Sequence, residues 1–167
     1  MFVPFEKINE HARIWVYQAN RKFNSDESNI ISQTLLAFTE NWLVHGQPMH
    51  ASFDLKFNQF IILAADDQVS APSGCSIDDS VRTVKKLGAE LGIDFFDRTL
   101  IAFRSNEDIF TISSSDLKAK LKEEMWNRDT LVFNNLVGTK RELVQSWMVP
   151  AGTTWLKRYL PQQSVVG

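Results

Sequence analysis

Two strand-like runs separated by only two residues constrain the fold of this chain more than any other feature. Residues 51–57 alternate between apolar and polar side chains, and the next run, residues 60–66, is apolar up to its final aspartate. The connection is Asn58-Gln59, and asparagine tolerates the left-handed backbone of a tight turn. The sequence therefore predicts a β-hairpin whose second strand is buried.

Hydrophobic periodicity predicts further elements on both sides of this hairpin. Residues 12–19 are β-branched and aromatic, which predicts a strand. Apolar residues at helical spacing predict helices over residues 25–44 and 77–91, and residues 100–103 predict another strand. The order strand, helix, strand, strand, helix, strand is that of the ferredoxin-like βαββαβ arrangement, in which the first and third strands lie centrally.

The remainder of the chain predicts a C-terminal layer of strands and helices. We expect strands at residues 109–112 and 131–133, and helices at residues 115–126, 140–147 and 154–160. No repeat, low-complexity segment or linker divides the chain. The sequence therefore predicts a single α+β domain over residues 1–167, with a mostly antiparallel sheet, a ferredoxin-like N-terminal portion and this C-terminal layer.

The register of the hairpin decides which residues share a face of the sheet. With a turn at Asn58-Gln59, the face toward the helices carries Phe53, Leu55, Phe57, Phe60, Ile62 and Ala64. The opposite face then carries Ile61, Leu63 and Ala65. Leaving Ile61 or Leu63 in water would forgo about 1.5 to 3 kcal/mol for each side chain. We therefore expect residues 116–160 to cover this outer face.

Charge and cysteine content exclude several classes of protein. Lys and Arg number 18 and Asp and Glu number 20, so the formal charge of −2 disfavours nucleic-acid binding. A single cysteine forms no internal disulfide, and the first residues lack the apolar core of a signal peptide, so we expect a cytoplasmic location. No apolar run is long enough to cross a bilayer, so direct membrane insertion is not expected. The oligomeric state stays open.

The start of the second predicted helix is the candidate binding site. Ser76 and Asp79 form a capping-box pattern there, and a helix N-terminus offers unpaired N–H groups and the positive end of the dipole. Ser73, Gly74 and Ser76 are small enough to let a phosphate or carboxylate approach. Together with Arg82, these three are the candidate ligand-binding residues. The alternative is an ordinary capped helix that binds nothing.

The only cysteine, Cys75, lies in the same turn, where the helix dipole favours a thiolate. The predicted hairpin register pairs His50 with Asp67 at this end of the sheet. Cys75 as nucleophile, His50 as base and Asp67 as the residue that orients His50 would form a minimal cysteine-dependent catalytic site. The alternative, which we favour, is that Cys75 packs as a small buried apolar residue.

The sequence patterns do not favour a metal site, a cofactor site or an RNA-binding site. Asp66-Asp67 and Asp78-Asp79 could meet as ligands of a hard cation, but paired aspartates at these positions are common without a metal. The three histidines lack zinc spacing. Trp15 and Tyr17 could stack bases, but the third strand lacks the pattern of an RNA-recognition module. We expect no metal and no cofactor.

Four short stretches carry a family resemblance: WVYQANR at residues 15–21, SGCSID at 73–78, FDR at 96–98 and VFNNL at 132–136. Their order resembles a family of small uncharacterised bacterial proteins that often carries the label "ABC transporter ATPase", over nearly the whole chain. The resemblance implies no established chemistry. The sequence has no G-x-x-x-x-G-K-[ST] loop and no L-S-G-G-Q motif, so P-loop ATPase activity is not expected.

The sequence thus predicts a non-enzymatic binding or interaction module for a small anionic ligand or a protein partner. The alternative function is a cysteine-dependent enzyme that uses Cys75 with His50 and Asp67. A cavity that holds Cys75 and His50 within hydrogen-bond reach would favour the enzyme, and a sealed Cys75 would favour the module.

Overall fold

The computed structural model describes residues 1–66, 68 and 71–162, which form two compact units. The first unit comprises Met1–Asp97 with Asn135–Gln145, and the second comprises Arg98–Asn134 with the described residues from Ser146 onward. Both contain antiparallel strands and helices, so the predicted α+β class with a mostly antiparallel sheet is confirmed. That the whole chain is one domain stays a prediction. Among the described residues, no helix combines the length and the apolar character that a bilayer crossing needs.

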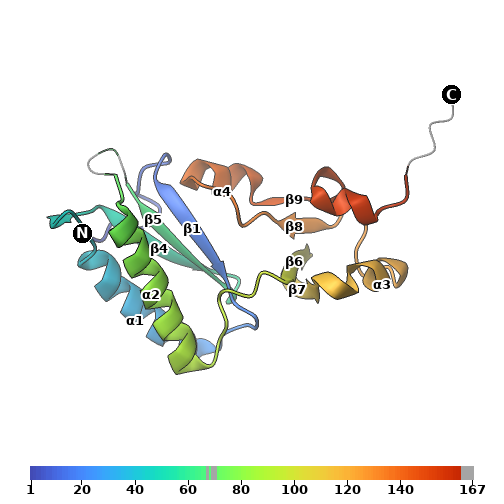
Figure 1. Cartoon of the computed structure of the whole chain (residues 1–167), viewed down its shortest axis with the longest axis horizontal. Helices are drawn as coiled ribbons and strands as arrows, with labels where there is room; N and C mark the ends of the chain where they lie inside the picture. Colours follow the sequence, from blue (N-terminus) through green and yellow to red (C-terminus); the bar gives the residue numbers. More distant parts are fainter. Residues whose placement is uncertain (67, 69–70, 163–167) are drawn as a thin grey trace. The chain divides into compact units, whose positions relative to one another are not determined.

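The first unit is built on a three-stranded antiparallel sheet in the order β1-β5-β4. Its strands are β1 (Arg13–Gln18), β4 (Ala51–Lys56) and β5 (Phe60–Ala65). Two helices, α1 (Ser25–Glu40) and α2 (Gly74–Leu91), lie together on one side of this sheet (Figure 1). Every residue of β5 is buried, as its apolar sequence predicts for a central strand.

The predicted fourth strand of a ferredoxin-like sheet does not join this one. Strand β6 (Leu100–Ser105) pairs instead with β7 (Asp108–Ser113), its neighbour in sequence, in the second unit. A hairpin with a two-residue connection has a small loop-closure cost, which favours this local pairing. At the outer edge of β1, Ile14 N donates to Gly138 O at 3.1 Å. The four-stranded prediction is therefore wrong, and β1 is an edge strand with a short contact to another segment.

The hairpin of β4 and β5 turns through three residues, because Lys56 pairs with Phe60. Gln59 N donates to Lys56 O at 3.1 Å, and both Phe57 and Asn58 have positive φ, 55° and 53°. The predicted turn at Asn58-Gln59 is one residue out of register. Such a slip moves every side chain of one strand to the other face of the sheet.

The corrected register reverses the predicted faces of β5. Ile61 and Leu63 face the helices, with Phe53 and Leu55 beside them, so the prediction that they form the outer face is wrong. The core on the helix side comprises Tyr17, Ala19, Phe23, Ile31, Leu35, Ile61, Leu63, Val84, Leu87, Ile93 and Phe95. Helical and strand periodicity place these residues on the facing surfaces of both layers.

The opposite face of the sheet carries Phe60, Ile62 and Ala64, which are fully buried. The segment 135–145, within the region expected to cover the outer face, belongs to this unit and contributes the buried Val137 and Leu143. It contains most of α4 (Lys140–Ser146), which lies across the sheet from α1 and α2 in Figure 1. The chain thus buries both faces of its central strand.

After α1 the chain forms a small hairpin rather than more helix. Helix α1 ends at Glu40, and β2 (Leu43–Val44) pairs with β3 (Gln47–Pro48). His45 and Gly46 both have positive φ, 50° and 76°, as a tight two-residue hairpin turn requires. The predicted helix over residues 25–44 is therefore too long at its C-terminal end.

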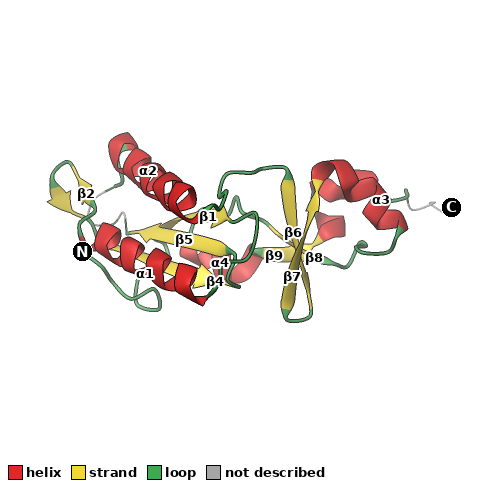
Figure 2. Ribbon diagram, turned by 90° about the horizontal axis from the view of Figure 1, so that it is seen from below, coloured by secondary structure: helices red, strands yellow, loops and turns green. Residues whose placement is uncertain are grey.

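The second unit contains a four-stranded antiparallel sheet in the order β7-β6-β8-β9. Its strands are labelled in Figure 2. Its short strands are β8 (Leu131–Phe133) and β9 (Met148–Pro150). Helix α3 (Leu117–Lys122) ends before Trp126, whose indole N–H donates to Leu117 O at 2.8 Å. The remaining helical turns are 3-10: η1 (Ser114–Asp116), η2 (Ala151–Thr153) and η3 (Trp155–Tyr159).

Candidate functional site

The N-terminus of α2 lies three residues earlier than predicted, with Ser73 as its N-cap. The Ser73 hydroxyl accepts from Ser76 N at 3.2 Å, and the Ser76 hydroxyl accepts from Ser73 N at 2.7 Å. The Ser76 hydroxyl also donates to Ser73 O at 2.8 Å. The capping box therefore joins Ser73 to Ser76, and the predicted box of Ser76 with Asp79 is wrong, because Ser76 is already inside the helix.

This cap occupies much of the predicted anion site. The hydroxyls of Ser73 and Ser76 bond to the cap itself, and Ser76 is buried. Gly74 is exposed, but Arg82 lies eight residues further on, about 12 Å along the helix axis. There Arg82 forms an ion pair with Asp79. The structure does not bring Arg82 to the helix N-terminus.

Cys75 is the second residue of α2 and is exposed, so the prediction of a packed cysteine is wrong. The buried serines Ser76 and Ser80 are one helical turn apart and turn inward, which leaves Cys75 on the solvent side. His50 O accepts from Asp66 N at 2.8 Å, so Asp66 takes the place opposite His50 that was predicted for Asp67.

Asp67 itself lies outside the described residues. Within the part of the chain that the structure describes, no hydrogen bond joins Cys75 to His50, which is half-buried. Nor do those residues contain a group of three or more His, Cys, Asp or Glu side chains placed to hold a metal ion. The geometry therefore gives the predicted cysteine site no assembled base.

Arg82 instead lines a groove of about 400 Å³ between the C-terminal end of α1 and one face of α2. We call this the α1–α2 groove; its lining residues are Phe38, Asn41, Trp42, Leu43, Asp79, Arg82, Thr83 and Lys86. The four residues from α2 recur at helical spacing, so one continuous stripe of that helix forms a wall. Cys75 precedes Asp79 by four residues on the same stripe.

The neutral donors of the α1–α2 groove are bonded within the chain. The Asn41 amide donates to Ala37 O at 2.8 Å, the Thr83 hydroxyl to Asp79 O at 2.9 Å, and the Trp42 indole N–H to Ser76 O at 2.9 Å. Each of these bonds helps to hold the groove in shape. The charged side chains of Arg82 and Lys86 therefore supply most of the side-chain donors left for a ligand.

Two cations and one carboxylate set the charge of this groove. Arg82 is paired with Asp79; the Arg82 side chain is largely exposed and the Asp79 side chain is about half-exposed. Lys86 has no ion-pair partner among the described residues. The groove as a whole therefore carries one positive charge in excess, in a chain whose formal charge is −2.

The apolar wall of the groove follows from where α1 ends. Phe38 packs on the buried Trp42, with ring centroids 4.8 Å apart, and Leu43 is 47% exposed. The sequence does not predict this apolar wall, because the predicted helix over residues 25–44 places Leu43 on a helix and not on a strand. The turn-forming pair His45-Gly46 was the available sign that the helix stops earlier.

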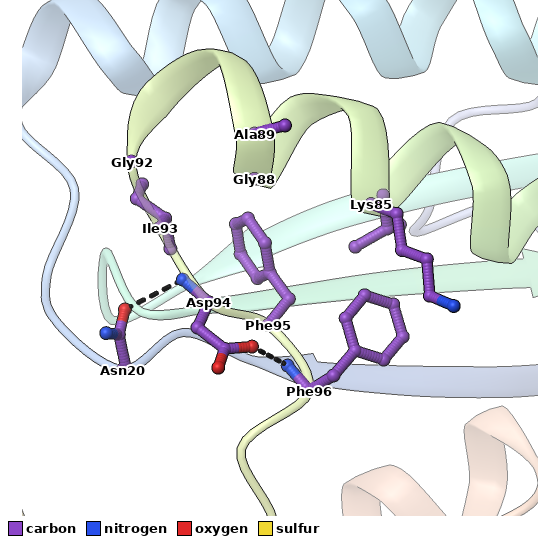
Figure 3. Close-up of a pocket in the computed structure, with 10 residues that line it drawn as sticks. Asn20, Lys85, Gly88, Ala89, Gly92, Ile93, Asp94, Phe95 and Phe96 are labelled. Atoms are coloured by element: carbon purple, nitrogen blue, oxygen red, sulfur yellow. Dashed lines mark hydrogen bonds between the residues drawn. The ribbon is translucent and has the colours of Figure 1, made fainter.

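A second groove, of about 460 Å³, lies on the other side of α2 near its C-terminus (Figure 3). Asn20 Oδ1 accepts from Asp94 N at 2.9 Å, and Asp94 Oδ1 accepts from Phe96 N at 2.8 Å. The Lys85 ammonium lies 5.5 Å from the centroid of the Phe96 ring. One cation and one carboxylate balance here, so this groove has no charge preference.

Comparisons with known proteins supply no function for either groove. No family model, no curated protein and no solved structure matches this chain. The chemistry of the described residues is therefore the basis for any functional proposal.

Proposed function

We propose that this protein is a non-enzymatic binding module whose α1–α2 groove receives a small anionic ligand. The observation that carries the proposal is Lys86, an ammonium without an ion-pair partner among the described residues, in a groove whose neutral side chains already donate within the chain. A carboxylate or sulfonate placed there would gain charge-assisted hydrogen bonds. We favour a small ligand over a protein partner because about 400 Å³ is within the range of small-molecule sites.

Adjacent lysines provide the test. Lys85 and Lys86 line different grooves, so replacing either one by glutamine changes the net charge equally but alters only one groove. The probe is 8-anilinonaphthalene-1-sulfonate, an anionic fluorescent dye, titrated into the folded protein. Lys86→Gln should raise the dissociation constant about three- to tenfold, which corresponds to the loss of one partly solvated charged contact.

Lys85→Gln should change the same dissociation constant by less than about twofold, since that lysine faces the other groove. Equal weakening by both variants would mean that the dye responds only to overall charge. No saturable dye binding to the folded protein would also contradict the proposal.

A cysteine-dependent enzyme remains the second candidate because Cys75 is exposed in the first turn of α2, where reactive cysteines are commonly found. If His50 assists the thiol, the rate of alkylation by iodoacetamide at pH 7 should fall in His50→Gln. If Cys75 serves no catalysis, it should react at the rate of an ordinary exposed cysteine in both proteins. The second result would leave the binding module as the sole proposal.

The family resemblance and the expected cellular location are both compatible with a non-enzymatic binding module. The resemblance to the small bacterial family labelled "ABC transporter ATPase" supports no nucleotide chemistry, because the phosphate loop is missing from the sequence. We propose that the purified protein does not hydrolyse ATP, and turnover that disappears on a point mutation in this chain would contradict that. The single cysteine, which forms no internal disulfide, supports a cytoplasmic location.

A further inference from the structure

We infer that the ligand of the α1–α2 groove is a monoanion with a flat apolar body, such as an aryl carboxylate, and that Asp79 competes with it for Arg82. This inference rests on the proposed function and adds the chemical class of the ligand. Hydrogen bonding, apolar surface and charge within the groove support it separately.

The hydrogen bonding of the groove disfavours ligands rich in polar groups. Among the described residues that line it, Asn41, Trp42 and Thr83 already donate to carbonyl oxygens of the chain. A sugar or a peptide would find few free neutral donors and would lose its own hydration on binding. Recognition is left to charge and to apolar contact.

The apolar wall favours a ligand with a hydrophobic body. Leu43 is 47% exposed on the two-residue strand β2, and the partly buried Phe38 is packed on Trp42. A flat ring laid against these side chains would remove apolar surface from water, which is favourable in proportion to the area buried. A small hydrated anion such as acetate cannot make this contact.

The charges of the groove match one negative charge. Arg82 and Lys86 supply two cations, and Asp79 supplies one carboxylate. In the structure the Asp79 carboxylate accepts from the Arg82 guanidinium, as a ligand carboxylate would. Because the Arg82 side chain is largely exposed and the Asp79 side chain is about half-exposed, water screens this ion pair, and a ligand can displace it. A second negative charge on the ligand would face Asp79.

Three probes separate these contributions: 1-naphthoate, 1-naphthalenemethanol and acetate. Binding is followed by two-dimensional ¹H–¹⁵N NMR through the indole N–H of Trp42, identified with Trp42→Phe. We expect 1-naphthoate to bind at least about tenfold more tightly than either of the others. If the neutral alcohol binds as tightly, the anion site and the proposed function both fail. If acetate binds as tightly, the anion site stands and the inferred ligand class fails.

Neighbouring aspartates test the competition for Arg82. Asp79→Asn and Asp78→Asn change the net charge equally, but only Asp79 lines the groove and pairs with Arg82. We expect Asp79→Asn to tighten 1-naphthoate binding about threefold or more and Asp78→Asn to change it less than twofold. Asp79→Ser repeats the test if Asp79→Asn does not fold. Equal tightening by both asparagine variants, or weakening by Asp79→Asn, would overturn the role of Asp79.

Discussion

Arg21 donates from its two terminal nitrogens to the two carboxylate oxygens of Glu27, over 2.9 and 2.8 Å. The same guanidinium donates to Leu91 O at 2.9 Å, so it links the start of α1 to the end of α2. Glu27 also accepts from Asn24 N at 3.0 Å in the capping box of α1. The bond from Arg21, and then the bond from Asn24, lower the pKa of Glu27 from 4.5 to about 2.

This pair should make stability depend on pH in a defined window. Because the pKa of Glu27 is lower in the folded state, its charged form contributes stability above about pH 4.5, and that contribution is lost as the pH falls toward 2. Glu27→Gln should therefore be less stable than the parent at pH 7, and the difference should shrink between pH 5 and pH 3. Urea unfolding at several pH values measures this. A difference for Glu27→Gln that does not depend on pH would contradict the prediction.

The turn between β4 and β5 predicts opposite tolerance to two substitutions at Asn58. Asn58 has a φ of 53°, in the left-handed region. There a residue with a Cβ but no polar side chain, such as alanine, is destabilised by about 1 to 2 kcal/mol, whereas glycine is not. Asn58→Ala should lower the free energy of unfolding by about 1 kcal/mol, and Asn58→Gly should leave it unchanged or raise it. Chemical denaturation of both variants tests this. An alanine variant as stable as the glycine variant would argue against the left-handed turn.

The same turn shows why the elements of the first unit were predictable and their register was not. Alternation in residues 51–57 and the apolar run that follows indicate two strands on hydrophobicity alone. Register depends on the length of the turn, and here Phe57 takes positive φ. Aromatic residues rarely adopt that backbone conformation, so the sequence favours the shorter turn. A register error of one residue therefore assigns Ile61 and Leu63 to the wrong face of the sheet and pairs His50 with the wrong aspartate.

The candidate site was predictable only in part, for a related reason. The sequence predicts Arg82 as a candidate ligand-binding residue at the helix N-terminus, and its role in binding stays a prediction. Its actual neighbours, Leu43 and Lys86, depend on where α1 ends and on which face of α2 meets it. These are tertiary relationships, and periodicity within one helix does not contain them.

The Lys140 side chain should contribute more to the stability of the first unit than an ordinary surface lysine does. Its ammonium donates to Phe5 O at 2.7 Å, Ile8 O at 2.8 Å and Glu6 O at 3.2 Å, and lies 5.4 Å from the Phe5 ring centroid. Lys140→Met keeps the aliphatic stem and removes these charged bonds. The free energy of unfolding should fall by about 1.5 to 3 kcal/mol.

The neighbouring Arg141 supplies the control for Lys140. Its side chain is exposed and has no hydrogen bond or ion pair among the described residues, while its backbone N–H donates to Glu10 O at 2.8 Å. Arg141→Met should therefore stay within about 0.5 kcal/mol of the parent. If Lys140→Met is equally harmless in thermal and urea unfolding, the three carbonyl contacts do not form in solution.

Ser52 should be a position where removing a polar group stabilises the fold. Its hydroxyl is fully buried beside Ala64 on the face away from α1 and α2, and it has no hydrogen-bond partner among the described residues. A buried hydroxyl without a partner costs about 1 kcal/mol or more. Ser52→Ala should raise the free energy of unfolding by about 1 kcal/mol.

Ser80 provides the matched control. It is equally buried, but its hydroxyl donates to Ile77 O at 2.6 Å, so Ser80→Ala should lower the free energy of unfolding by about the same amount. Urea unfolding of the two alanine variants should therefore give changes of opposite sign, and a loss of stability in both would mean that the Ser52 hydroxyl is satisfied in solution.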